Sequence, residues 1–310
     1  QTEYRQKNSR SNHIADFSFF SEKNKNTKNH FFYEFDKDLN INNFNESEIK
    51  ISIQNTSNDT YLRSHKIKSE IVNDKNILQN SIDLNLYANE FSLNMNSTVY
   101  EDLDKNDTDR YEYILPNINL LKKINNKTNL NGNFYLKSQG LVRNYDTNVT
   151  EKTNTNDIIF KSYPKINSLG FSNNYEFVVR NSNSDNENTK YKNNENIYLS
   201  SIYQYNSTLP LLKENKKFRK ILKPKISFKI APNHTKDERN GDAKIDINNI
   251  YSINRLGGNN SIEGGASITY GGEYSIVNKQ NSLKIIDFKI ASNLRFDEND
   301  DLPNNHQIGE

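Results

Sequence analysis

The sequence predicts an all-β protein whose antiparallel strands form part of a large transmembrane β-barrel. Three observations lead to this prediction. Apolar residues recur at every second position in many separate runs, which is the period of a strand and not of a helix. Each run has one apolar and one strongly polar face, and only 33% of the residues are hydrophobic. Several runs reach the roughly ten residues of a bilayer-crossing strand, whereas most strands have about 5–6 residues.

The clearest alternation covers residues 262–277, and residues 286–297 repeat it. A barrel strand turns its apolar face to lipid and its polar face to a wet lumen. We therefore expect the polar faces of these two runs to point into the lumen. The lumen-facing candidates are Glu263, Ser267, Thr269, Glu273, Asp287, Lys289, Asn293 and Arg295.

Shorter runs show the same pattern at 82–87, 91–96, 49–53 and 224–230. The phase changes between Ala88 and Phe91, which predicts a tight turn. Together the runs predict roughly a dozen to fifteen strands, no helix and no domain boundary. Polar stretches predict the loops, at 22–30, 101–110, 181–196, 233–244 and 297–306.

Glycine is concentrated in NRLGGNNSIEGGASITYGG, residues 254–272. A phosphate-binding loop needs a Lys-Ser/Thr pair after its glycines, or a helix that follows a strand, and neither pattern is present. A flexible linker would interrupt the alternation, which instead continues through the glycines. We therefore expect strand glycines that mark bends, bulges or close backbone approach, with Gly257 and Gly258 in the preceding turn.

Composition excludes several classes of function. The chain has no Cys, so it has no disulfide, zinc-thiolate site or thiol nucleophile. Basic and acidic residues number 41 and 39 and are interspersed, which argues against nucleic-acid binding. The five His residues lack metal-binding spacing, and we expect them in loops or on the surface. We expect no catalytic residue, metal or cofactor.

Four stretches resemble one known family, and they occur in that family's order. They are SNDTYLRSHKI (57–67), RYEYILPNINL (110–120), ILKPKISFKIAPN (221–233) and INNIYSINRLGGNNSIEGGASITYG (247–271). The family is the LPS-assembly protein LptD family. The positions that carry the resemblance are Asp59, Tyr61, Leu62, Arg63, Leu115, Pro116, Asn254, Arg255, Gly258, Glu263, Gly264, Gly265, Tyr270 and Gly271.

The resemblance implies a very large barrel in the cell outer membrane that assembles lipopolysaccharide into the outer leaflet. It also implies four kinds of partner: an LptE-like plug lipoprotein inside the barrel, lipopolysaccharide itself, periplasmic lipopolysaccharide-bridge proteins and outer-membrane lipid. The family has no catalytic residues. Arg63 and Arg255 lie in the matching motifs, where we expect each to organise a turn or form a lumenal ion pair.

The chain departs from the family pattern in several ways. We expect residues 1–310 to be a single partial barrel domain, because the family's N-terminal periplasmic jellyroll and terminal barrel strands are not recognisable and Cys is absent. Such a segment should not fold alone, since an unclosed barrel leaves open edges. Two alternatives remain: another outer-membrane barrel such as a porin or receptor, and a secreted Asn-rich β-protein or adhesin.

Overall fold

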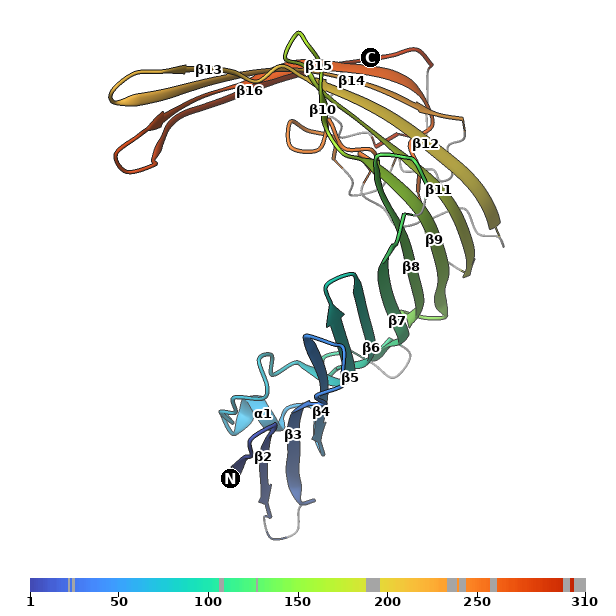
Figure 1. The fold of residues 1–310 in the computed structure, drawn as a ribbon. Helices are drawn as coiled ribbons and strands as arrows, with labels where there is room; N and C mark the ends of the chain where they lie inside the picture. Colours follow the sequence, from blue (N-terminus) through green and yellow to red (C-terminus); the bar gives the residue numbers. More distant parts are fainter. Residues whose placement is uncertain are drawn as a thin grey trace. The chain divides into compact units, whose positions relative to one another are not determined.

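The computed structural model describes residues 1–21, 23, 26–105, 109–126, 128–187, 196–232, 239, 244–256, 261–297 and 302–303. In this part of the chain the strands form one 16-stranded sheet (Figure 1). Their order is β1-β2-β3-β4-β5-β6-β7-β8-β9-β11-β12-β14-β15-β16, with β10 beside β11 and β13 beside β14. The predicted all-β antiparallel architecture is confirmed, and it is consistent with part of a barrel.

The strands are β1 (Thr2–Lys7), β2 (Ser11–Phe20), β3 (Lys28–Asp38), β4 (Glu46–Thr56), β5 (Ile77–Ala88), β6 (Phe91–Asp102), β7 (Tyr111–Ile124), β8 (Gly132–Tyr145), β9 (Val149–Ser162), β10 (Lys165–Ile166), β11 (Ser172–Glu187), β12 (Asn196–Thr208), β13 (Leu211–Glu214), β14 (Phe218–Ala231), β15 (Gly265–Asn278) and β16 (Lys284–Arg295). The predicted tight turn is confirmed, because Ala88 at the end of β5 pairs with Phe91 at the start of β6.

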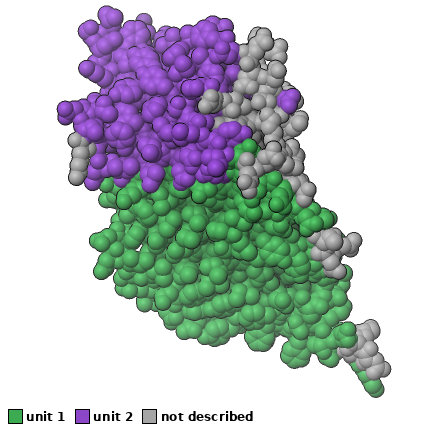
Figure 2. Space-filling model, turned by 90° about the vertical axis from the view of Figure 1, so that its right-hand side faces the viewer, with its two compact units in different colours: residues 1–122, 137–154, 184–196 green, residues 123–136, 155–183, 197–310 purple. Residues whose placement is uncertain are grey.

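The chain divides into two compact units (Figure 2). The first unit comprises residues 1–122, 137–154 and 184–196, and the second comprises 123–136, 155–183 and 197–310. The division crosses strands β7, β8, β9 and β11 and does not follow loops. One continuous barrel domain therefore stays a prediction.

In the second unit the two faces of the sheet differ sharply in accessibility. On β14, Ser227 and Lys229 are buried, whereas Ile226, Phe228 and Ile230 are exposed. The apolar residues are thus on the open face and the polar residues are on the covered face, the reverse of a soluble sheet packed on a core. This inversion is the arrangement of a strand whose apolar face contacts lipid.

Connecting segments cover the polar face in each unit. In the first unit, residues 57–76 join β4 to β5 and bury Tyr61, Leu62 and Ile71 against Phe32 of β3 and Leu78 of β5. These apolar side chains form a small hydrophobic core between the segment and the sheet, on a strand face that is otherwise polar.

In the second unit, the segment between β14 and β15 covers the polar face in the same way. Ile262 packs with Ile202 of β12 and Ala231 of β14, and Ile245 packs with Leu256. Small apolar clusters therefore fix each covering segment to an otherwise polar surface.

The two ends of the sheet differ in the length of their connections. In the second unit, the turns at 215–217 and 279–283 are short, whereas the connection at the opposite end of β14 spans 232–264. In the first unit, short turns at 8–10 and 89–90 contrast with the connection 57–76 at the opposite strand ends. Long connections on one side and short turns on the other are typical of outer-membrane barrels.

Leu115 and Pro116 lie in an irregularity of β7. The pairing with β6 changes from Thr98↔Ile114 to Asn96↔Asn117, so two residues of β7 oppose a single residue of β6. Proline cannot donate a ladder hydrogen bond and is accommodated at such bulges.

Several predicted boundaries were wrong. The predicted loop 181–196 begins only after Glu187, because β11 continues to that residue. The hydroxyl of Ser182 lies 3.4 Å from that of Thr155, and Lys152 pairs with Asp185 at 2.8 Å, so cross-strand contacts outweigh the low strand propensity of an Asn-rich sequence. The strand predicted at 262–277 begins at Gly265, whose φ is +94°.

The prediction of no helix was also wrong, since α1 forms at Tyr61–Ser64. This single turn is too short to give a 3.6-residue period in the sequence. Among the residues that the structure describes, no helix has the length and apolar character needed to cross a membrane.

Candidate functional site

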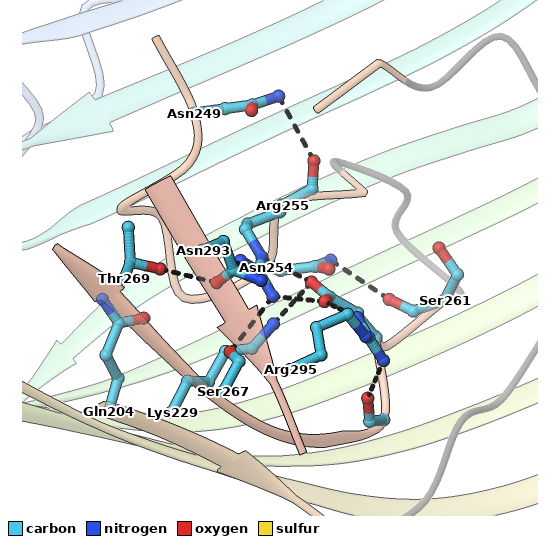
Figure 3. A network of polar contacts seen from close by, with 12 residues as sticks. Gln204, Lys229, Asn249, Asn254, Arg255, Ser261, Ser267, Thr269, Asn293 and Arg295 are labelled. Atoms are coloured by element: carbon cyan, nitrogen blue, oxygen red, sulfur yellow. Dashed lines mark hydrogen bonds and ion pairs between the residues drawn. The ribbon is translucent and has the colours of Figure 1, made fainter. Parts of the chain in front are cut away.

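A deeply buried polar cluster lies where the 232–264 connection meets β14, β15 and β16 (Figure 3). Its centre is the ion pair between Arg255 and Glu263, which are 2% and 1% exposed. Arg255 Nε donates to Glu263 Oε2 at 2.7 Å, and Arg255 Nη2 donates to Glu263 Oε1 and to Ser267 Oγ. The guanidinium fork thus binds both oxygens of the carboxylate.

Two further cations reach the same carboxylate. Lys229 of β14 places Nζ 2.5 Å from Glu263 Oε2, and Arg295 of β16 donates to Glu263 Oε1. Arg295 also donates to the carbonyl of Gly264 at 3.1 Å. Glu263 therefore joins the covering segment to both β14 and β16. We call Lys229, Arg255, Glu263 and Arg295 the glutamate cluster.

The charge state of Glu263 is strongly fixed. Burial alone would raise the pKa of its carboxyl, but the charges of Lys229 and Arg255 outweigh burial and lower the pKa to about 2. The carboxylate therefore stays ionised at neutral pH and stabilises the three cations that surround it.

Amide and hydroxyl groups extend the glutamate cluster along β15 and β16. Asn293 Oδ1 accepts hydrogen bonds from Arg255 Nη1 at 2.6 Å and from Thr269 Oγ1 at 2.8 Å. Asn254 Nδ2 donates to the carbonyl of Ser261 at 3.1 Å. The segment is thus tied to the strands at several points, as Figure 3 shows.

Gly271 marks a close approach between strands and segment. A Cβ at this position would lie 2.1 Å from the carbonyl oxygen of Ile290 on β16 and 2.8 Å from the hydroxyl of Tyr251. The expected close backbone approach is confirmed at this glycine. Burial, with a smaller contribution from Glu273, raises the pKa of Tyr251 to about 12, so its hydroxyl stays protonated.

The first unit contains a second buried polar group beneath its covering segment. Tyr61 Oη lies 2.6 Å from Ser18 Oγ, and Ser18 Oγ lies 3.2 Å from His30 Nδ1. His30 Nε2 lies 3.2 Å from Asp16 Oδ1. The expectation that His30 lies in a loop or on the surface was wrong, because it is 2% exposed on β3 and stacks on Phe32.

Ion pairs at the surface flank Tyr61. Arg63 Nη1 lies 2.7 Å from Asp104 Oδ1, and Arg110 Nη2 lies 2.6 Å from Asp59 Oδ1. The hydrogen bond and charge of Arg110 hold the pKa of Asp59 below its ordinary value. The Tyr-Leu-Arg stretch is thus anchored by burial of Tyr61 and by charge on either side.

A family model for LPS transport system D matches residues 28–308. The chain belongs to the LptD family. A comparison with curated proteins found no match. Membership supports a role in lipopolysaccharide transport and identifies a transport protein rather than an enzyme family. It favours this family over the porin, receptor and adhesin alternatives, and the β-rich fold is consistent with an outer-membrane component.

The LptD-like motif positions fall into distinct places in the structure. Tyr61 and Leu62 form α1 and are buried, and Asn254, Arg255 and Glu263 form or border the glutamate cluster. Tyr270 is 52% exposed on the apolar face of β15. Gly257 and Gly258 lie outside the described residues.

The lumen-facing candidates of this LptD chain lie on the polar side of β15 and β16, except Glu263, which lies in the connection just before β15. Four of the predicted residues meet in one network of contacts. Arg255 binds Glu263, Ser267 and Asn293, and Glu263 also binds Arg295.

The other candidates lie along the same face without joining the glutamate cluster's ion pairs. Glu273 pairs with Lys225 at 2.5 Å, Asp287 pairs with Lys284 at 2.9 Å, and Lys289 lies opposite Glu273 in the ladder. That this face borders a lumen stays a prediction.

Lys229 and the Asp16–Ser18–His30 group were not predicted from the sequence. The sequence did contain a usable signal for Lys229. It lies two residues from Ser227 and Ala231, on the same face of the strand, and alternates with the apolar Phe228 and Ile230 of the other face. The second group depends on the pairing of β2 with β3, which places Ser18 opposite His30, and the alternation in the sequence does not give that register.

Proposed function

We propose that this chain forms part of an outer-membrane β-barrel that inserts lipopolysaccharide into the outer leaflet. The observation that supports the proposal is the inverted sheet, with an exposed apolar face and a polar face covered by the chain's own segments. On β16, Phe288, Ile290 and Leu294 are 56%, 61% and 55% exposed, and no soluble sheet gains from leaving such a row in water.

The two faces match the two halves of the lipid. Lipopolysaccharide carries acyl chains, which lose about 0.8 kcal/mol per CH₂ when exposed to water, and sugars, which lose their hydrogen bonds in hydrocarbon. A lumen lined by Lys, Ser, Thr and Asn side chains can solvate the sugars while the acyl chains move toward the bilayer. Delivery by periplasmic lipopolysaccharide-bridge proteins would supply the lipid.

Charge placed on each face tests the orientation. Ile290→Lys puts a charge on the proposed lipid face, where it should cost up to ~2–4 kcal/mol near the bilayer midplane. Ser275→Lys puts the same charge on the opposite face of neighbouring strand β15, where we expect little effect. The measurements are the amount of full-length protein assembled in the outer membrane and the amount of surface lipopolysaccharide. Equal defects in the two variants would contradict the proposal.

An LptE-like plug lipoprotein is the proposed partner of the polar face beyond the covering segment. Asp287 and Lys289 lie there, exposed, on β16. Lys289→Glu should reduce copurification of the plug lipoprotein, whereas Lys165→Glu, at an exposed lysine of β10, should not. Unchanged copurification in Lys289→Glu would remove this residue from the interface.

A further inference from the structure

The tip of the β13–β14 hairpin concentrates positive charge. Lys213, Lys216, Lys217 and Lys220 are all exposed, and none of the four ammonium groups has an ion-pair partner within the described part of the chain. We propose that these lysines bind the anionic headgroups of phospholipids in the inner leaflet of the outer membrane. We call them the hairpin lysines.

The ladder register places two of these charges side by side. Lys213 of β13 pairs directly with Lys220 of β14, and the next pair on the same face is Leu211 with Leu222. Like charges in directly opposed positions destabilise a sheet in water. A phosphate between the two ammonium groups would remove that repulsion and form two charge-assisted hydrogen bonds.

The acidic residue of this hairpin, Glu214, pairs with cations on the polar face of the sheet and not with the hairpin lysines. Glu214 pairs with Arg219 and with Lys279, the latter at 3.2 Å. Arg219 alternates with Lys220 along β14, so the two side chains point to opposite faces. Charge on the polar face is therefore neutralised within the protein, whereas charge on the apolar face is left for another partner.

The position of Lys220 along β14 matches the boundary between the hydrocarbon core and the headgroups of a bilayer. The apolar row on this face runs from Leu222 to Ile230, and both residues are 43% exposed. Eight steps of about 3.3 Å give roughly 26 Å along the strand, and a tilt of about 40° shortens this to about 20 Å across the membrane. Lys220 and Lys213 follow directly beyond this row, where long lysine side chains reach headgroup phosphates.

The lengths of the connections between strands assign the hairpin lysines to the inner leaflet. The hairpin lysines lie at the end of the short turns 215–217 and 279–283, opposite the long connection 232–264. Outer-membrane barrels turn their short connections to the periplasm. The inference therefore rests on the proposed function for the orientation of the sheet, and its lipid is a phospholipid with a net negative headgroup.

The test compares two charge-matched double variants of the full-length protein. Lys213→Gln/Lys220→Gln removes the opposed pair, and Lys66→Gln/Lys68→Gln removes two exposed lysines from the 57–76 segment. Each protein is reconstituted in vesicles of phosphatidylcholine with and without phosphatidylglycerol, and the lipids that stay bound on extraction are quantified. We expect the hairpin variant to lose its preference for phosphatidylglycerol about tenfold or more, and the control to keep it.

Salt provides an independent readout, because raising ionic strength should abolish the wild-type preference by screening the lysines. A hairpin variant that keeps the wild-type preference, or a control that loses as much, would overturn the inference. If Ile290→Lys assembles normally, the proposed bilayer orientation itself fails. If Ile290→Lys is defective and the hairpin variant retains its preference, only the headgroup site fails.

Discussion

Replacing Glu263 by Gln should loosen the covering segment of the second unit. The substitution keeps the size of the side chain but removes the carboxylate that Lys229, Arg255 and Arg295 share. Lowering the pKa of Glu263 from 4.5 to about 2 corresponds to about 3 kcal/mol. Removal of one partner from a buried ion pair costs a similar ~3–5 kcal/mol. At 1.4 kcal/mol per factor of ten, opening of the segment should become about 100-fold more frequent.

Hydrogen exchange of the full-length protein in detergent at neutral pH measures this opening directly. Amides within residues 244–256 should exchange about 100-fold faster in Glu263→Gln than in the wild type. Glu48→Gln is the matched control, since Glu48 pairs with Lys50 at 3.3 Å on the surface, and such pairs contribute about 0–1 kcal/mol. Equal protection of these amides in the two variants would refute the reasoning.

Three other outcomes are expected. Because the folded-state pKa of Glu263 is lowered, its contribution to stability is complete above pH 4.5 and is lost as pH falls toward about 2. The protection of residues 244–256 against hydrogen exchange should therefore decrease over this pH range in the wild type but not in Glu263→Gln. Tyr61→Phe removes the hydrogen bond to Ser18 and should lower the free energy of unfolding of the first unit by about 1 kcal/mol, measured by denaturant titration. Gly271→Ala should lower the thermal midpoint much more than Gly140→Ala, where the nearest atom to an added Cβ is 4.0 Å away.

The sequence was sufficient for features that depend on a local period. Alternation in 262–277 and 286–297 assigns apolar and polar faces without knowledge of which strands pair, so the two faces of β15 and β16 were predictable. Close backbone approach at Gly271 was predictable as a class of feature, because a glycine inside an alternating strand commonly marks a bulge, a bend or a neighbouring backbone that leaves no room for a Cβ.

Contacts between distant segments were not predictable from the same pattern. Lys229 and Glu263 meet only because a long connection returns over the sheet, and period-two alternation contains no information on where a connection lies. The extension of β11 through Asp185 was missed for a related reason, since its support comes from β9 and not from its own propensity.

The covering segment of the first unit has a consequence for the order of assembly. Its core involves Phe32, Tyr61, Leu78 and Leu103, all from the first third of the chain. In a sheet that closes on itself, a segment on the inner surface has to be in place before the two edges meet. Because these core residues are made early, the segment can dock on β2–β5 while the later strands are still unpaired. If the covered polar face borders a barrel lumen, membrane insertion would begin with that lumen already partly filled, and no loop would have to enter a closed barrel.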